Sequence, residues 1–123
     1  MKSPATTLMF GVPTVHDETG DIQAAELARL FEVSQAQLAR MAGLSRQRLH
    51  QSPRSSQVQR ALRRLEYLFA RTRNLTGSPE TARIWLKMGH PDLEGIAPVE
   101  VLEEGHIGAV EDFLLAIETG SPR

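Results

Sequence analysis

The last third of the chain decides the fold: residues 80–120, with the sequence ETARIWLKMGHPDLEGIAPVEVLEEGHIGAVEDFLLAIETG. The Ser-Pro-Glu triplet at 78–80 is a helix-start signal, because serine caps a helix, proline fits its first turn and glutamate suits its positive end. The helix that it predicts carries the only tryptophan, Trp85, and is expected to end at Gly89. An amphipathic helix therefore opens this region.

Two more helices are predicted after an irregular link over residues 90–97. Pro98 stands where a helix would begin, and Gly105 is placed to stop it. The final helix has apolar residues at helical spacing and ends at Gly120; these apolar residues are Ile107, Val110, Phe113, Leu114 and Ile117. The C-terminal third is thus predicted to be entirely helical.

The ordered set of residues in this third resembles the toxin-binding domain of Xre/MbcA/ParS antitoxins, the partners of RES-domain toxins. The positions that carry the resemblance are Trp85, Leu86, Pro91, Leu93, Gly95, Pro98, Leu102, Gly105, Val110, Leu114, Ile117 and Gly120. The resemblance extends upstream and covers roughly residues 22–123. It implies a toxin-binding role for Trp85, Pro91, Leu93, Gly95, Pro98, Leu102, Gly105, His106, Val110, Phe113, Leu114, Ile117 and Arg123.

Length and composition fit one compact unit, or two small helical subdomains that share a core, since the chain has 123 residues and is 41% hydrophobic. It has no cysteine, which excludes disulfides and thiolate metal sites. We expect neither a cleaved leader nor a membrane span, because no apolar run is long enough for either. These features favour a soluble protein of the cytoplasm.

The net charge of −1 conceals a strong segregation of charge along the chain. Residues 34–73 hold nine arginines against one glutamate, a balance of +8. The balance is −3 over residues 1–33 and −6 over residues 74–123. A basic middle and an acidic end suggest two different partners.

The region before the long helix has the pattern of a helix-turn-helix. Residues 1–20 show no periodicity and are expected to form a flexible arm, and Asp21 is expected to cap a first helix with Ala24, Leu27, Ala28 and Phe31 on one face. Ser34 and Gln37 form a capping box for a short second helix. Gly43 is placed to supply a left-handed turn, and Ser45 to cap a third helix that points Leu49 inward.

The third helix presents side chains that can contact DNA, and the segment resembles the Xre-type helix-turn-helix. Arginine can pair with guanine, glutamine with adenine, and serine or arginine with phosphate. The predicted DNA-binding residues are Ser45, Arg46, Gln47, Arg48, His50, Gln51 and Arg54. The helix is short, because Ser52 and Pro53 end it after about two turns. A packing module with a solvated arginine face is the alternative interpretation.

A long helix over residues 57–75 is predicted to support both regions. Its apolar stripe consists of Val58, Ala61, Leu62, Leu65, Leu68, Phe69 and Thr72, and its arginines lie mostly on the rest of the cylinder. The predicted fold is therefore all-α. Its parts are an arm (1–20), an Xre-like helix-turn-helix region with its support helix (21–77), and a small toxin-binding and dimerisation domain (78–123).

The motifs of catalytic and cofactor-binding sites are missing from the sequence. The four histidines, at 16, 50, 90 and 106, lack the spacing of metal ligands. No phosphate-binding loop and no nucleophile elbow is present. We therefore expect no enzyme activity, no metal, no cofactor and no small-molecule substrate.

Two functions from different classes remain open at this point. The resemblance implies an antitoxin that occludes the active site of a RES-domain, NAD+-consuming toxin and, as a homodimer, represses its own promoter. A stand-alone helix-turn-helix transcriptional regulator without a toxin partner is the alternative. A pure adaptor without a nucleic-acid role is a weaker third interpretation.

Overall fold

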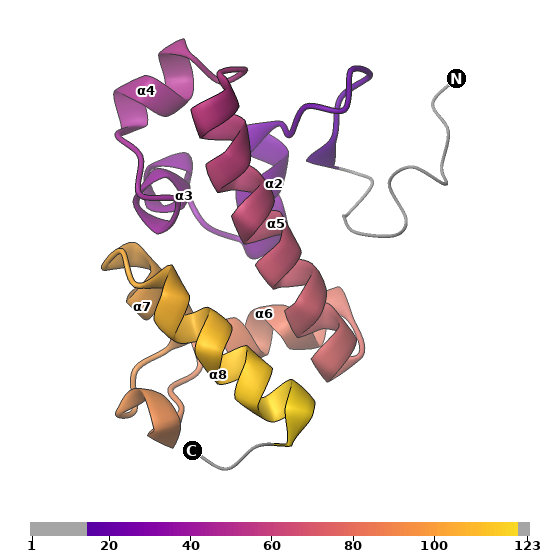
Figure 1. The fold of residues 1–123 in the computed structure, drawn as a ribbon, viewed down its shortest axis with the longest axis vertical. Helices are drawn as coiled ribbons and strands as arrows, with labels where there is room; N and C mark the ends of the chain where they lie inside the picture. The colour runs from indigo at the N-terminus through magenta and orange to yellow at the C-terminus, as the bar shows by residue number, and fades with distance from the viewer. Residues whose placement is uncertain (1–14, 121–123) are drawn as a thin grey trace.

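The structure is a computed structural model that describes residues 15–120, and it is all-α (Figure 1). No strand occurs in this range; its two isolated bridges join His16 to Ile22 and His90 to Ile96. The elements in chain order are α2 (Ala24–Phe31), α3 (Gln35–Met41), α4 (Arg46–Gln51), α5 (Ser56–Thr76), α6 (Pro79–Lys87), the 3-10 turn η2 (Pro91–Leu93), α7 (Pro98–Glu103) and α8 (Ile107–Thr119). None of the described helices is long and apolar enough to cross a membrane.

Helix α5 is the axis of the molecule. Helices α2, α3 and α4 surround its first half, and α6, α7 and α8 surround its second half (Figure 1). We call these two groups, each with its half of α5, the upper half and the lower half. One continuous cluster of buried side chains runs through both, so the halves share a core.

The predicted stripe of α5 is largely confirmed. Val58, Leu62, Leu65, Leu68, Phe69 and Thr72 are all buried, whereas Ala61 is half-buried. Two polar side chains that the periodicity did not predict, Gln59 and Glu66, are buried on the same helix. Buried polar groups require partners, and both receive them from the segment that precedes α2.

That segment, residues 15–22, differs from the flexible arm predicted for residues 1–20. Val15 and Ile22 are buried, and His16 Nε2 lies 2.6 Å from the Glu66 carboxylate. The amide of Gln59 accepts a bond from the Ile22 N–H and donates one back to the Ile22 carbonyl. Residues 15–20 are therefore part of the folded body, while residues 1–14 lie outside the described range.

Local signals predict the starts of most upper helices correctly. Ser34 and Gln37 form the expected capping box, Ser45 caps α4, and Gly43 has a positive φ of 71°. The predicted cap at Asp21 is wrong: Gln23 occupies the N-cap of α2 and makes no side-chain bond there. The Asp21 carboxylate binds Arg54 instead, because a distant cation competes for it more strongly than the helix end.

The lower half also follows its sequence signals. Ser78 caps α6 with Pro79 in its first turn, Pro98 begins α7, and Gly120 ends α8 with a φ of 70°. The backbone folds tightly between α6 and α7, where a Cβ atom on Gly89 would lie 2.1 Å from the Gly95 carbonyl oxygen. Helix α6 ends at Lys87 and not, as the sequence had predicted, at Gly89. Position 89 requires glycine for another reason, which is that the backbone of Gly95 passes too close to leave room for a side chain.

Candidate functional site

The outer face of α4 is polar and exposed. Leu49 points into the core, whereas Arg46, Gln47, Arg48, His50 and Gln51 are all exposed. A hollow of about 560 Å³ lies beside this face and is lined by Gln35, Arg46, Gln47, Leu49 and His50. The structure thus brings five of the seven predicted DNA-binding residues together on one short helix, between α3 and the start of α5.

Ser45 and Arg48 have roles within the fold as well. The Ser45 hydroxyl accepts a bond of 3.0 Å from the Arg48 N–H, which satisfies the start of α4. The guanidinium of Arg48 donates to the side-chain oxygen of Gln57 at the start of α5. Arg48 therefore lies on the side of α4 that faces α5.

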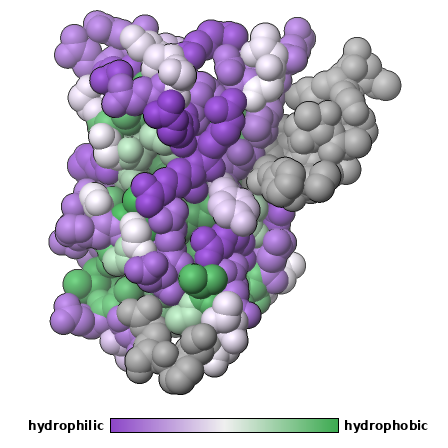
Figure 2. Space-filling model, viewed as in Figure 1, coloured by the Kyte–Doolittle hydropathy of each residue, from purple (hydrophilic) through white to green (hydrophobic). Residues whose placement is uncertain are grey.

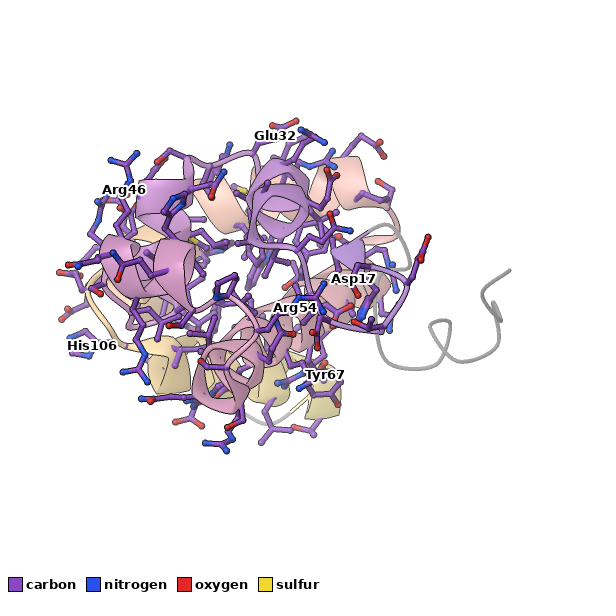
Figure 3. All side chains as sticks on the ribbon, turned by 90° about the horizontal axis from the view of Figure 1, so that it is seen from above. Asp17, Glu32, Arg46, Arg54, Tyr67 and His106 are labelled. Carbon is purple, nitrogen blue, oxygen red and sulfur yellow. The ribbon has the colours of Figure 1, made fainter. Side chains whose placement is uncertain are left out.

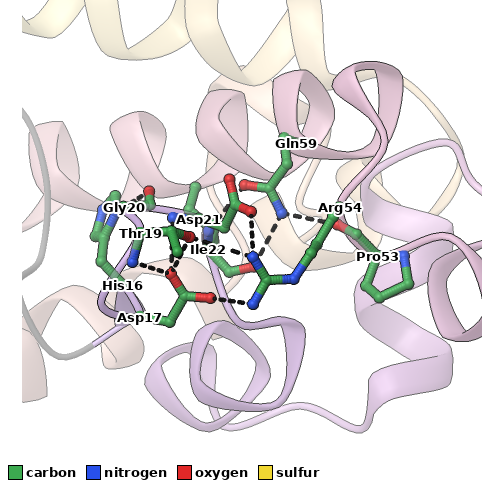
Figure 4. Close-up of polar contacts among 9 residues, drawn as sticks. All are labelled: His16, Asp17, Thr19, Gly20, Asp21, Ile22, Pro53, Arg54 and Gln59. Atoms are coloured by element: carbon green, nitrogen blue, oxygen red, sulfur yellow. Dashed lines mark hydrogen bonds and ion pairs between the residues drawn. The ribbon is translucent and has the colours of Figure 1, made fainter.

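Arg54, the seventh predicted DNA-binding residue, is held by acidic side chains (Figure 4). Its guanidinium lies 3.0 Å from Asp17 and 3.1 Å from Asp21, and its neighbour Pro53 is fixed through its carbonyl, which accepts from Gln59. The hydroxyl of Thr19, backbone N–H groups and the charge of Arg54 lower the pKa of Asp17. These bonds fasten the loop that follows α4 to the segment that precedes α2.

Three further arginines pair with glutamates of the C-terminal region. Arg40 binds Glu103 at 2.7 Å, Arg64 binds Glu111 at 2.6 Å and Arg71 binds Glu118 at 2.7 Å. Hydrogen bonding to its carboxylate partner raises the pKa of Arg64 and of Arg71, and the Arg64 guanidinium lowers the pKa of Glu111. Three of the nine arginines of residues 34–73 and three of the nine carboxylates of residues 74–123 therefore pair with one another, so the sequence overstates the charge that each region offers to a partner.

Many of the predicted toxin-binding residues form the core of the lower half. Leu93, Pro98, Leu102, Val110, Phe113 and Leu114 are buried, and the half-buried Trp85 stacks on Phe113 with ring centroids 5.4 Å apart. His90 lies against both rings and bonds the Trp85 carbonyl through Nε2 at 2.9 Å. These side chains shape the lower half from within.

Five other predicted toxin-binding residues are exposed and lie in three segments. Pro91 and Gly95 lie in the link around η2, Gly105 and His106 lie between α7 and α8, and Ile117 is near the end of α8. Arg123 lies outside the described residues. The exposed members of this set therefore come from three separate segments of the lower half.

Exposed apolar side chains form a second set, of which the sequence pattern had selected only Ile117. The large exposed hydrophobic residues in the described range are Tyr67, Leu75, Ile84, Met88, Leu115 and Ile117. Ile84, on α6, is 63% exposed, and Met88, the residue that follows the helix, is 50% exposed; both line one groove. A helical projection of α6 would have separated Ile84 from the buried Ala82 and Leu86.

The two halves consequently differ in surface character. On the face drawn in Figure 2, hydrophilic side chains cover most of the upper half, and the larger hydrophobic areas lie over the lower half. Within residues 15–66 no large hydrophobic side chain is strongly exposed. Across residues 15–120, no group of three or more His, Asp or Glu side chains could hold a metal ion.

Comparison with known proteins gives one finding, and it concerns the lower half. Residues 71–120 match the family model described as the antitoxin Xre/MbcA/ParS C-terminal toxin-binding domain. No curated protein and no solved structure matches the chain. The match supports a toxin-binding domain of this type and an antitoxin role with a protein toxin as partner. It does not extend to the region of α2, α3 and α4.

Proposed function

We propose that this protein is the antitoxin of a type II toxin–antitoxin system, that it neutralises a RES-domain toxin that consumes NAD+, and that it binds its own promoter. The observation that carries the proposal is the coincidence of two features in one region. Residues 71–120 match a toxin-binding domain, and five of the six exposed large hydrophobic residues of the described range lie within that match. Exposed apolar area is typical of protein-binding surfaces.

The contact with the toxin would use the exposed apolar side chains of α6 and α8. The groove beside α6 has a volume of about 500 Å³ and is lined by Glu32, Glu80, Arg83, Ile84, Lys87 and Met88. The buried residues among those that carry the resemblance, such as Leu102 and Leu114, would act by fixing these helices. Inhibition would follow from occlusion, with α8 and the residues after it covering the dinucleotide cleft of the toxin.

DNA binding would use α3, the turn after it and α4. The polar face of α4 carries Arg46, Gln47, His50 and Gln51, the side chains that read or hold DNA in the major groove. Binding as a homodimer would place two such helices on paired half-sites. Autorepression is the regulatory consequence.

The test is co-purification followed by an activity assay. The tagged chain, expressed in its own host, should retain a stoichiometric RES-domain protein, and that protein alone should deplete NAD+ in a reaction that added antitoxin stops. Retention of promoter DNA without any protein partner would contradict the antitoxin proposal and leave a transcriptional regulator.

A variant that lacks residues 121–123 tests the occlusion step. If this variant inhibits the toxin as well as the full chain does, residues 121–123 have no part in inhibition.

A further inference from the structure

The nine arginines of residues 34–73 divide into two groups. Four of them pair with carboxylates: Arg40, Arg54, Arg64 and Arg71. Among residues 15–120 the other five form no ion pair with a carboxylate: Arg46, Arg48, Arg60, Arg63 and Arg73. The second group supplies the charge that an anionic partner would meet.

Three of the unpaired arginines form a continuous strip. Arg48 bonds Gln57, and Gln57 lies one helical turn before Arg60, which in turn lies one turn before Arg63. Side chains three positions apart are neighbours on a helix surface, and all three arginines are exposed. The strip therefore runs from the side of α4 along the outer face of α5.

The paired arginines set the limits of this strip. On the side toward α8, Arg64 is neutralised by Glu111. At the loop between α4 and α5, Arg54 points toward Asp17, as Figure 3 shows from above. A phosphate at either arginine would have to compete with the carboxylate already bound there, and that carboxylate would repel it.

Arg46 lies on the other flank of α4. Two residues turn a helix by about 200°, so Arg46 and Arg48 point to nearly opposite sides of it. Arg46 lines the hollow next to α3, and Figure 3 places it at the outer edge of the molecule. Cationic groups thus flank α4 on both sides, as a helix in the major groove requires between two phosphate backbones.

We propose that Arg48, Arg60 and Arg63 form a phosphate-binding strip for duplex DNA, and that Arg54 is a positioning residue that does not contact DNA. The inference rests on the DNA binding proposed above and extends it to α5. It assigns affinity and salt dependence to the strip, and base contacts to the exposed face of α4.

The experiment compares two double variants that lose the same charge. R60Q/R63Q removes two exposed arginines of the strip, and R40Q/R64Q removes two paired arginines that are also exposed, 54% and 52% for their side chains. Full-length protein is titrated onto a fluorescent promoter duplex and onto an unrelated duplex over a range of salt concentrations. Thermal melting establishes that each variant is folded.

R60Q/R63Q should reduce the slope of log K against log salt by about 2, roughly one for each lost contact, and should weaken binding equally on both duplexes. R40Q/R64Q should keep the slope of the wild type, because those arginines already have partners. Equal loss of slope in both variants, or an unchanged slope in R60Q/R63Q, overturns the strip while DNA binding stands. Wild-type protein that binds no duplex at low salt overturns the DNA part of the proposed function, and the strip with it.

Discussion

The upper and lower halves of this molecule share one core but present opposite kinds of surface. The upper half exposes guanidinium and amide groups on α4 and the start of α5, and the lower half exposes large apolar side chains on α6, directly after it and on α8. Three glutamates of the acidic C-terminal sequence are paired with arginines of α3 and α5. Charge along a sequence therefore says little about surface until its internal pairs are known.

A substitution that disrupts only the lower half should separate the functions of the two halves most clearly. A Cβ atom at Gly89 would meet the Gly95 carbonyl oxygen at 2.1 Å, so Gly89→Ala must displace the backbone of the link. We expect a loss of about 3–5 kcal/mol in the free energy of unfolding, measured by urea denaturation. Toxin binding should fail before DNA binding does.

Gly108→Ala is the matched control. Gly108 lies inside α8, its φ is not positive, and a methyl group added to it would meet no atom within 4 Å. Alanine should therefore stabilise α8 by up to about 1 kcal/mol. Equal damage from both substitutions would show that the close approach of Gly89 to Gly95 is not the cause.

The apolar surface of the lower half is tested next by I84S/M88S. Both side chains are exposed, so stability should change little, whereas affinity for the toxin should fall by about 2–4 kcal/mol if they are contact residues. Calorimetric titration with the toxin measures this. Tyr67→Ser, at a residue of similar exposure (52%) outside the matched range, should leave the affinity unchanged. A greater loss of toxin affinity in Tyr67→Ser than in I84S/M88S would indicate that the toxin contacts α5 instead of α6.

The upper half has its own sensitive point at Gln59. Its buried amide bonds the Ile22 N–H, the Ile22 carbonyl and the Pro53 carbonyl. Gln59→Ala leaves these groups without a partner and should cost about 1–3 kcal/mol, measured by thermal unfolding. DNA affinity should fall because Pro53 follows α4, and toxin affinity should persist at temperatures where the variant is folded. A fall in toxin affinity alone would contradict this division.

The smallest expected effect concerns the ion pairs that join the halves. Arg64 lowers the pKa of Glu111, so this carboxyl contributes stability above its unfolded pKa and loses the contribution as pH falls through its folded pKa. E111Q should cost a few tenths of a kcal/mol at neutral pH, since the pair is partly exposed, and the cost should vanish in acid, where the carboxyl is protonated. Asp112→Asn is the matched control, because it removes a neighbouring exposed carboxylate that forms no ion pair within residues 15–120. If E111Q still lowered the free energy of unfolding in acid, the Glu111 side chain would stabilise the fold by packing and not by its charge.

Local sequence signals are sufficient for most of the fold. Caps such as Ser34, Ser45 and Ser78 act on the backbone three residues away, and apolar spacing determines which face of α5 is buried. The expected cap at Asp21 fails because its partner, Arg54, is 33 residues distant. A short-range rule cannot weigh a cation that only the tertiary fold brings near.

The candidate sites are harder to predict for the same reason. The pattern at 85–117 selects residues that build a helical unit, and many of these are buried. Exposed residues such as Ile84 and Met88 stand outside that pattern, because nothing in the fold of the chain itself demands them. Likewise, the nine arginines look equivalent in the sequence, and only their positions relative to Glu103, Glu111 and Glu118 in space distinguish them.

The pairs Arg64–Glu111 and Arg71–Glu118 join residues that are both 47 positions apart, so α5 and α8 run in the same direction. A parallel pair of helices must be linked by a chain that travels back, and α6, η2 and α7 make that return. If residues 78–123 were exchanged for those of another protein, the new last helix would not fit the surface of α5. The exchange would have to include the part of α5 that contacts α8. The unit that can be recombined between such proteins begins inside a helix, well before the turn at Gly77.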